Sequence, residues 1–205
     1  MWYSKLDDCR TAANNEDVIF SEDVSCSGCK RFLVGSLEKC LNIYSSTYPR
    51  HWYEVIDPNK PCRLFFDLDS TEKIELQKIL KEIATCFKLH YKQNIVPPYI
   101  LTACDTSKQS YHIVYPIFFQ NIFHIGAFVR RIVLYLKELH PTLAIPIDYA
   151  VYTQWRQFRI KGSTKKGSQR ILKSETSLRD TLLQNGPVNE PLICSEINNS
   201  EPLKT

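Results

Sequence analysis

Short runs of apolar, aromatic and β-branched residues bounded by turn-forming residues recur in the first third of the chain, and such runs are typical of β-strands. Val18 to Phe20 and Arg31 to Val34 are two such runs, separated by turn-forming residues, and they predict a hairpin. Trp52 to Ile56 and Arg63 to Leu68 are β-prone runs separated by Asp57-Pro58-Asn59-Lys60, a turn with proline at its second position. A second hairpin is expected there.

The apolar period lengthens after Ser70, where residues three and four positions apart share one side. These residues are Leu76, Ile79, Leu80, Ile83 and Phe87. They predict a helix that begins just after Asp69, with Ser70 as its N-cap. Tyr99 to Cys104 and Tyr111 to Ile117 then predict two strands joined by a polar turn. A second helical stripe follows, made of Ile125, Phe128, Val129, Ile132, Leu136 and Leu139.

Two further strands are expected at Val151-Tyr152 and at Gln157 to Lys161. Beyond about Glu175 the sequence is rich in Asn, Glu, Ser and Pro and has no sustained period. We therefore expect a folded core of residues 1–175 and a flexible tail or linker of residues 176–205. The mixture of strands and helices predicts an α/β fold.

Composition narrows the class of protein. A chain of 205 residues that is 43% hydrophobic can bury one substantial core or two closely packed units. Several of the eight cysteines lie within apolar runs, and neither a secretory signal nor a membrane span is evident. An intracellular, reducing compartment without a membrane partner is expected. The net charge of +4 permits nucleic-acid binding, so the positions of the cations matter more than their sum.

Asp67 and Asp69 follow a strongly apolar run and are separated by one residue. Because side chains alternate along a strand, both carboxylates should point to the same face. Two such carboxylates repel each other unless a cation lies between them, and oxygen ligands beside a phosphate-bearing substrate suit Mg²⁺ or Mn²⁺. The plainer alternative for an isolated Asp-x-Asp is a solvated strand end that leads into a helix cap.

Ser110 and His112 are also separated by one residue, within an otherwise apolar strand. A hydroxyl and an imidazole on one strand face can both donate hydrogen bonds to phosphate oxygens, as a triphosphate pocket requires. The alternative is a structural histidine whose hydrogen bonds are satisfied inside the core.

The third segment combines an acid with regularly spaced cations. Asp148 is followed by a stretch without acidic residues up to Glu175 that contains Arg156, Arg159, Lys161, Lys165, Lys166, Arg170 and Lys173. Aromatic residues lie among them and offer stacking surfaces: Tyr152, Trp155 and Phe158. Cations interleaved with aromatic rings are typical of surfaces that bind single-stranded nucleic acid. A solvated charged face is the alternative.

Cys26-Ser27-Gly28-Cys29 has the spacing of half a zinc site or of a redox motif. A structural zinc site normally needs four ligands, and the sequence contains no second cysteine pair. We therefore interpret this segment as the turn of the first hairpin.

The three chemical segments occur in the order Asp-x-Asp, Ser-x-His, and a third Asp followed by basic residues. In this order they resemble the archaeo-eukaryotic primase superfamily. The resemblance is closest to the eukaryotic PrimPol (primase-polymerase) branch and related viral primases, and it extends from about Asp17 to Lys173. It implies an RRM-like α/β sheet that carries catalysis, a smaller N-terminal α/β subdomain, and an active cleft between them.

The resemblance also implies roles for particular residues. The metal ligands for Mg²⁺ or Mn²⁺ would be Asp67, Asp69 and Asp148. The phosphates of the incoming nucleoside triphosphate would be held by Ser110, His112, Arg159 and Lys165. Weaker candidates for nucleic-acid contact are Arg31, Arg156, Lys161 and Lys166. The implied function is template-directed DNA primase-polymerase activity in replication or damage tolerance, including translesion synthesis, on a single-stranded template and a primer.

The chain departs from the family pattern in two respects. Asp69 stands where vertebrate PrimPol has glutamate, which leaves the metal preference open. Only Cys194 lies beyond Cys104, so the downstream Cys/His zinc module that helps start primers is not evident. We therefore expect stronger primer extension than initiation, with a replication protein or zinc-bearing subunit as a partner.

Two other functions stay open at this point. One is a noncatalytic single-strand-DNA-binding or replisome subunit, and the other is an end-joining repair polymerase of the same superfamily. The expected location is the nucleus, the mitochondrion or a viral replication compartment.

Overall fold

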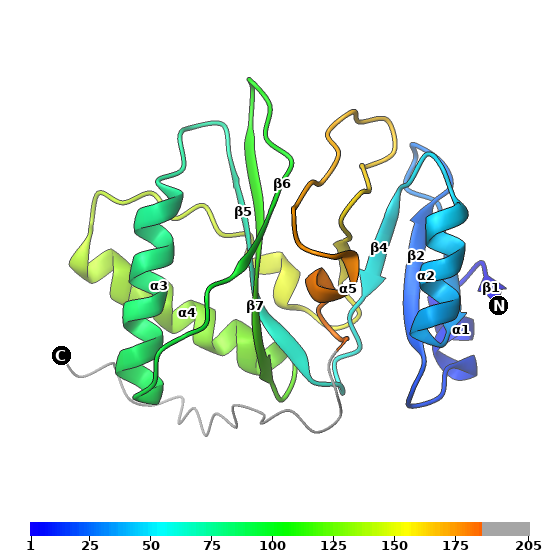
Figure 1. The fold of residues 1–205 in the computed structure, drawn as a ribbon, viewed down its shortest axis with the longest axis horizontal. Coiled ribbons are helices and arrows are strands. Elements are labelled where there is room, and N and C mark those ends of the chain that lie inside the picture. The colour runs from blue at the N-terminus through cyan, green and yellow to red at the C-terminus, as the bar shows by residue number, and fades with distance from the viewer. Residues whose placement is uncertain (186–205) are drawn as a thin grey trace.

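The computed structural model describes residues 1–185, which form a mixed α/β fold around two antiparallel sheets (Figure 1). Sheet A has five strands in the order β1 (Trp2–Tyr3), β3 (Lys30–Gly35), β2 (Val18–Asp23), β4 (Trp52–Val55) and β8 (Gln157–Arg159). Sheet B has three strands in the order β5 (Cys62–Ser70), β7 (Gln109–Phe119) and β6 (Tyr99–Thr102). The expected α/β class is confirmed.

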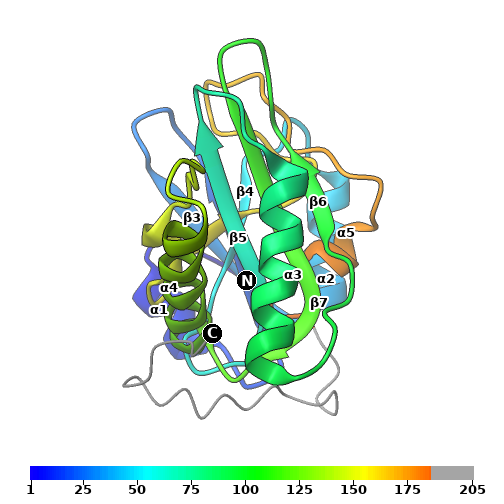
Figure 2. The same ribbon diagram turned by 90° about the vertical axis from the view of Figure 1, so that its left-hand side faces the viewer.

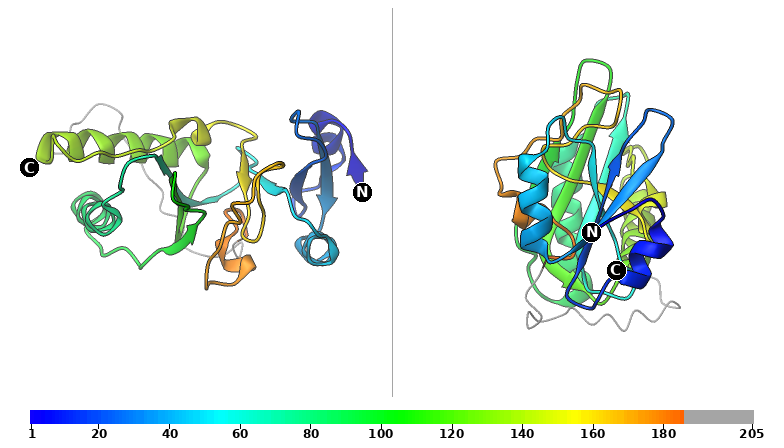
Figure 3. Two further views of the ribbon diagram at one scale, coloured as in Figure 1. Left: turned by 90° about the horizontal axis from the view of Figure 1, so that it is seen from above. Right: turned by 90° about the vertical axis from the view of Figure 1, so that its right-hand side faces the viewer.

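Helices cover the two sheets differently. The helices of the described residues are α1 (Leu6–Ala12), α2 (Leu37–Ser46), α3 (Leu76–Tyr91), α4 (Ile122–Leu139), α5 (Leu178–Thr181) and the 3₁₀ helix η1 (Tyr149–Tyr152). Figure 2 shows α3 and α4 together over one face of sheet B. Seen from above in Figure 3, the other face of sheet B is turned toward sheet A, with α5 and the preceding loop between them. No helix of the described part is long and apolar enough to cross a membrane.

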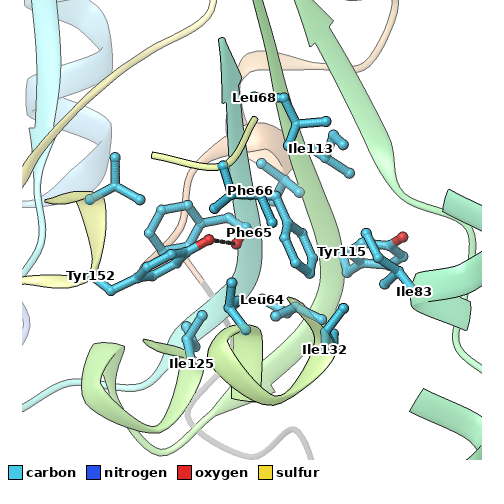
Figure 4. Close-up of a cluster of buried hydrophobic side chains, with 14 of the residues drawn as sticks. Leu64, Phe65, Phe66, Leu68, Ile83, Ile113, Tyr115, Ile125, Ile132 and Tyr152 are labelled. Carbon is cyan, nitrogen blue, oxygen red and sulfur yellow. Dashed lines mark hydrogen bonds between the residues drawn. The ribbon is translucent and has the colours of Figure 1, made fainter. Parts of the chain in front are cut away.

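The core beneath sheet B explains why α3 and α4 form where they do. Their apolar stripes are buried against the sheet, and Ile79, Ile83 and Ile125 have no exposed surface. Figure 4 shows Phe66, Ile83 and Ile132 in this layer. The Asn121 side chain begins α4 by accepting hydrogen bonds from the first free backbone N–H groups of the helix.

Sheet A is buried on both faces because its strands alternate between two apolar sets. Phe20 and Leu33 pack toward Tyr44 of α2, whereas Ile19 and Val34 belong to the cluster that contains α1. One face therefore rests on α2 and the opposite face on α1, and both faces are needed to fix the sheet.

The last described residues join the two sheets. The buried Arg63 guanidinium on β5 donates hydrogen bonds to the carbonyls of Asp180 (2.6 Å) and Leu182 (2.8 Å). The buried Glu54 carboxylate on β4 accepts from the backbone N–H groups of Leu183 (2.7 Å) and Gln184 (2.8 Å). Burial raises the pKa of Glu54 from 4.5 to about 7, although these hydrogen bonds oppose the shift.

This packing corrects the expected tail boundary. Residues 176–185 include α5 and the buried Leu182 and Leu183, so they belong to the folded body. Residues 186–205, the rest of the expected tail, lie outside the described residues.

The first expected hairpin is confirmed, since β2 and β3 pair along their whole length, and so is the pairing of β6 with β7. The second expected hairpin is wrong. The turn at Asp57 exists, but β4 pairs with β2 and β8 whereas β5 pairs with β7. The turn therefore leads the chain from one sheet to the other.

Two local predictions also need correction. The helix expected just after Asp69 begins only at Leu76, because β5 continues to Ser70 and Glu75 occupies the N-cap position. The strand expected at Val151-Tyr152 is part of η1. There the Asp148 side chain accepts a hydrogen bond from the N–H of Ala150, and the Tyr152 hydroxyl donates to the Phe65 carbonyl (Figure 4).

Candidate active site

The register between β5 and β7 brings the first two chemical segments together. Asp67 lies opposite His112, and Asp69 lies opposite Ser110. Residues directly opposite each other project from the same face, so these four side chains form a compact patch on the face of sheet B that α3 and α4 leave open. The intervening Leu68 points into the core and is fully buried.

Asp148 reaches the same patch from a separate segment. Its backbone N–H donates to the Asp67 carbonyl at 3.0 Å, and the N–H of Asp69 donates to the Pro146 carbonyl at 3.0 Å. An isolated bridge between Leu68 and Ile147 extends this pairing. The segment before η1 therefore lies along β5 and sets the third acid beside the first.

Sheet A supplies the facing cations. Arg159, on β8, pairs in register with Tyr53 of β4 and is buried. Lys165 lies in the loop after β8, and both cations line one cleft with Asp67, Asp69, Ser110, His112 and Asp148. The base of this loop is held by hydrogen bonds between Gly162 and Leu172 (2.7 Å) and between Leu172 and Ser163 (3.0 Å).

Gly162 shows how closely the start of the loop packs on α2. Its φ of 85° lies in the left-handed region, and a Cβ at this position would approach the Tyr44 hydroxyl to 2.6 Å. Any larger residue would displace either α2 or the loop. Gly162 thereby fixes the start of the loop that carries Lys165.

His112 is enclosed between the two sheets. Its ring stacks on Phe158 of β8, with 4.1 Å between centroids and 30° between planes. Burial, followed by the nearby charge of Arg159, lowers the pKa of His112 to about 3. The imidazole is therefore neutral near pH 7. Its Nδ1 atom is buried without a hydrogen-bond partner, while Nε2 lies 3.7 Å from Asp67 Oδ1.

Burial and neighbouring charges act differently on Asp67 and Asp69. Burial, followed by the charges of Asp69 and Asp148, raises the pKa of Asp67 to about 7. For Asp69, burial alone would raise the pKa, but hydrogen bonds from Lys108 and Ser110 lower it overall. A cation placed among the three acids would relieve this repulsion.

The donor set fits a hard divalent cation, although the acids are not arranged around a formed site. Within residues 1–185, no three Asp, Glu, Cys or His side chains make up a ready metal cluster. Lys108 Nζ instead lies 2.7 Å from Asp69 Oδ2, and Arg156 lies 3.8 Å from Asp148 Oδ2. Asp69 Oδ1 is buried without a hydrogen-bond partner, and every acidic donor is an oxygen, as Mg²⁺ and Mn²⁺ prefer. The expected metal ligation stays a prediction.

The structure separates the weaker candidates. Arg156 lines the cleft. Lys161 turns away from it and donates to the Thr176 carbonyl. Lys166 is exposed and is not among the residues that line the cleft. Arg31 lies on sheet A, where it pairs with Glu22 at 2.7 Å and lies over the Trp2 ring at 4.1 Å.

Sequence reasoning missed Lys108 and Tyr53, and it named Phe158 as a stacking surface without placing it against His112. Lys108 contacts Asp69, and its signal was present, because two-residue alternation places Lys108, Ser110 and His112 on one face. Tyr53 lines the cleft from β4, and Phe158 supports the His112 ring. The pairing of β4 with β8 brings both rings to the cleft, and no local sequence pattern predicts that pairing.

The cysteine pair lies in the turn between β2 and β3, as expected. Cys26 and Cys29 are exposed free thiols, and hydrogen bonds from Ser25 and Ser27 lower the pKa of Cys29. The turn interpretation agrees with this placement.

Comparisons with known proteins agree with a primase-like chain. The chain is 25% identical to "Putative primase" of Ostreid herpesvirus 1 over 224 aligned positions, which cover 89% of this chain and 19% of that protein. It is 29% identical to a second protein of the same virus, "Uncharacterized protein ORF49", over 150 positions, or 58% of this chain and 13% of that protein. No family model matches. The chain thus spans less than a fifth of the length of these relatives, and its similarity to the first supports a primase-related protein.

Proposed function

We propose that this chain is a template-directed DNA primase-polymerase of the PrimPol type that joins nucleotides with Mg²⁺ or Mn²⁺. The observation that carries the proposal is the convergence of three acids, a hydroxyl, a neutral imidazole and the cations Arg156, Arg159 and Lys165 in one cleft. They come from two sheets and four separate segments of the chain. The similarity to a viral "Putative primase" points the same way.

The two sheets supply side chains of opposite charge to the cleft. Sheet B supplies the acids Asp67, Asp69 and the neighbouring Asp148, which would hold the divalent cations. Sheet A and its loop supply Arg159 and Lys165, which would neutralise the phosphates of a bound nucleotide. A triphosphate bound between the two sets would have its charge balanced on both sides.

Ser110 and His112 lie where the two sets meet. The Ser110 hydroxyl and the one N–H of the neutral His112 imidazole would each donate a hydrogen bond to a phosphate oxygen. Because the low pKa of His112 keeps it uncharged near pH 7, its role is orientation, and Arg159 and Lys165 provide the positive charge.

The proposed reaction is nucleotidyl transfer. The 3′-hydroxyl oxygen of the primer attacks the α-phosphorus of the incoming nucleotide, a new phosphoester bond forms, and the bond to pyrophosphate breaks. The hydroxyl proton passes to solvent. Bound divalent cations would acidify the attacking hydroxyl and neutralise the departing pyrophosphate. Base pairing with the template selects the nucleotide, so these side chains need not read base identity.

The test is synthesis on circular single-stranded DNA with Mg²⁺ or Mn²⁺, with and without an annealed primer. We expect robust extension and weak unprimed synthesis by this chain alone, because initiation must order two nucleotides without a stacked primer. A circle offers no ends, so extension on it would also argue against an obligate end-joining polymerase. Absence of both activities would contradict the proposal and favour a noncatalytic DNA-binding subunit.

A further inference from the structure

A second hollow adjoins the proposed catalytic cleft. The two share Tyr53, Arg156 and Gln157 in their linings, so they are continuous. The remaining residues of this hollow, here called the Trp155 groove, are Lys30, Thr153, Gln154 and Trp155. The groove therefore runs from the catalytic residues toward the β2–β3 end of sheet A.

Trp155 is held in an unusual conformation in this groove. Its φ of 56° lies in the left-handed region, where a bulky side chain is a true outlier that often marks a functional site. The next residue is fixed, because the Arg156 carbonyl accepts a hydrogen bond from the N–H of Ile56 at 2.8 Å. The indole is half-buried against the cluster that contains α1, and the Arg10 guanidinium lies 4.1 Å from its centroid. The ring is thus fixed but still accessible.

Three cations lie over this ring or line the same groove: Arg10, Arg156 and Lys30. Arg156 lines the groove beside it, and Arg10 lies over it. Lys30 lies 3.9 Å from the centroid of Tyr53, which also lines the groove, and pairs with Asp23. Asp148, the partner of Arg156 at 3.8 Å, belongs to the proposed metal ligands, so metal binding would release that arginine. An accessible aromatic ring among cations is the usual construction of a single-strand binding groove.

We propose that the Trp155 groove binds the unpaired template strand on the 5′ side of the templating base, with one base stacked on Trp155 and backbone phosphates beside Lys30 and Arg156. This inference deepens the proposed function and rests on it for the direction of the strand. A duplex fits less well, because its bases already stack on their neighbours, whereas the template ahead of a primer end exposes a free face.

The first test measures affinity for a fluorescent single-stranded oligonucleotide by anisotropy, without metal or nucleotide. Trp155→Ala is expected to weaken binding by about tenfold, since one base–aromatic stack is worth that much or more. Trp155→Phe, which keeps a ring, should stay within about threefold of the wild type. Tyr48→Ala is the matched control, because Tyr48 is 86% exposed and lies outside the groove. Thermal unfolding of each variant checks that it is folded.

The second test separates stacking from charge. A primed template with one abasic nucleotide just 5′ of the templating base should bind the wild type about tenfold more weakly than the intact template. For Trp155→Ala, the affinities for the abasic and the intact template should differ by no more than about twofold. Lys30→Gln should instead make the slope of log affinity against log salt shallower by about 0.7, whereas Trp155→Ala should leave it unchanged.

The outcomes distinguish this inference from the proposed function. Equal loss on the abasic template in wild type and Trp155→Ala would overturn the stacking role. If a folded Trp155→Ala variant cannot be obtained, an unchanged affinity of the wild type for the abasic template overturns it as well. If Trp155→Ala binds DNA normally and still extends primers, the inference is wrong and the proposed function stands. If the wild-type protein extends no primer but its DNA binding still depends on Trp155, the proposed reaction is wrong and the inference stands.

Discussion

The two sheets contribute to the cleft in opposite ways. Sheet B presents its chemistry on one pair of neighbouring strands, where Asp67 and Asp69 lie opposite His112 and Ser110. Sheet A presents its chemistry through β8, a strand far from its partners in sequence, and through the loop that follows it. The register between β5 and β7 therefore fixes Asp67 and Asp69 relative to Ser110 and His112, while the distance from acids to cations depends on how the sheets pack. Each prediction below acts on one side of this contrast.

The largest effect is expected from removing the acids of sheet B. Asp67→Ala, alone or with Asp69→Ala, should reduce metal-dependent nucleotide addition by on the order of 10³-fold or more, because the proposed metal site is lost. The fold should survive, since burial and the neighbouring acids already disfavour the ionised Asp67 carboxylate. Primer extension and thermal unfolding measure the two effects. Glu72→Ala, which removes an exposed acid just beyond β5, is the control.

A smaller effect is expected at the contact between the sheets. His112→Ala should lower kcat/KM for the nucleotide by roughly 10²-fold, because a phosphate ligand is lost, while affinity for the template changes less than about twofold. Steady-state kinetics and oligonucleotide anisotropy separate the two. His140→Ala, at the end of α4 and outside the cleft, is the matched control. An unchanged kcat and KM for the nucleotide would mean that His112 is only structural.

The Glu54 carboxylate, which joins the two sheets, should make the free energy of unfolding depend on pH. Because the pKa of Glu54 is raised from 4.5 to about 7, the folded state binds more protons than the unfolded state between these values. Stability from this group is therefore present at low pH and falls as pH rises through about 7, by about 3 kcal/mol at most.

Denaturant unfolding of wild type and Glu54→Gln from pH 4.5 to 8 measures this term, since glutamine cannot titrate. The free energy of unfolding of the variant should change less steeply with pH. Comparing the two proteins at each pH cancels the similar contribution of Asp67. Parallel curves would show that folding does not raise the pKa of Glu54.

The smallest effect is expected at Lys161. Its ammonium group donates to the Thr176 carbonyl, away from the cleft. Lys161→Met should therefore leave affinity for single-stranded DNA within about twofold and lower the free energy of unfolding by about 1 kcal/mol. Anisotropy and denaturant unfolding check this. A large loss of DNA affinity with unchanged stability would restore the nucleic-acid role expected from the sequence.

The sequence predicts hairpins and side chains that share a strand face better than the pairing of distant strands, because the first two are local properties. Two-residue alternation correctly places Asp67 with Asp69 and Ser110 with His112, and the β6–β7 hairpin follows from its polar turn. The turn at Asp57 was also predicted, but turn chemistry does not determine which strand the next segment joins. β5 joins β7, which lies beyond α3 and β6 in the chain, while β4 pairs with β2 and β8.

Other misses have particular causes. Val151 and Tyr152 favour strands by residue type, but the Asp148 cap and the bond from Tyr152 to Phe65 select η1 instead. Lys161 looks like its basic neighbours in sequence, and only the packing of residues 176–185 shows its different role. Leu182 and Leu183 lie in a polar segment without period, so their burial was not predicted.

The central claim, that the acids of sheet B support metal-dependent nucleotide transfer, is tested most directly by single-turnover addition of one nucleotide to a primed template across a Mn²⁺ titration. The account predicts no addition in chelator, saturation with Mn²⁺ in the wild type, and a midpoint at least about tenfold higher in Asp69→Asn, because Asp69 Oδ1 is the buried oxygen left without a partner. No addition at any Mn²⁺ concentration, or the same midpoint in both proteins, would contradict it.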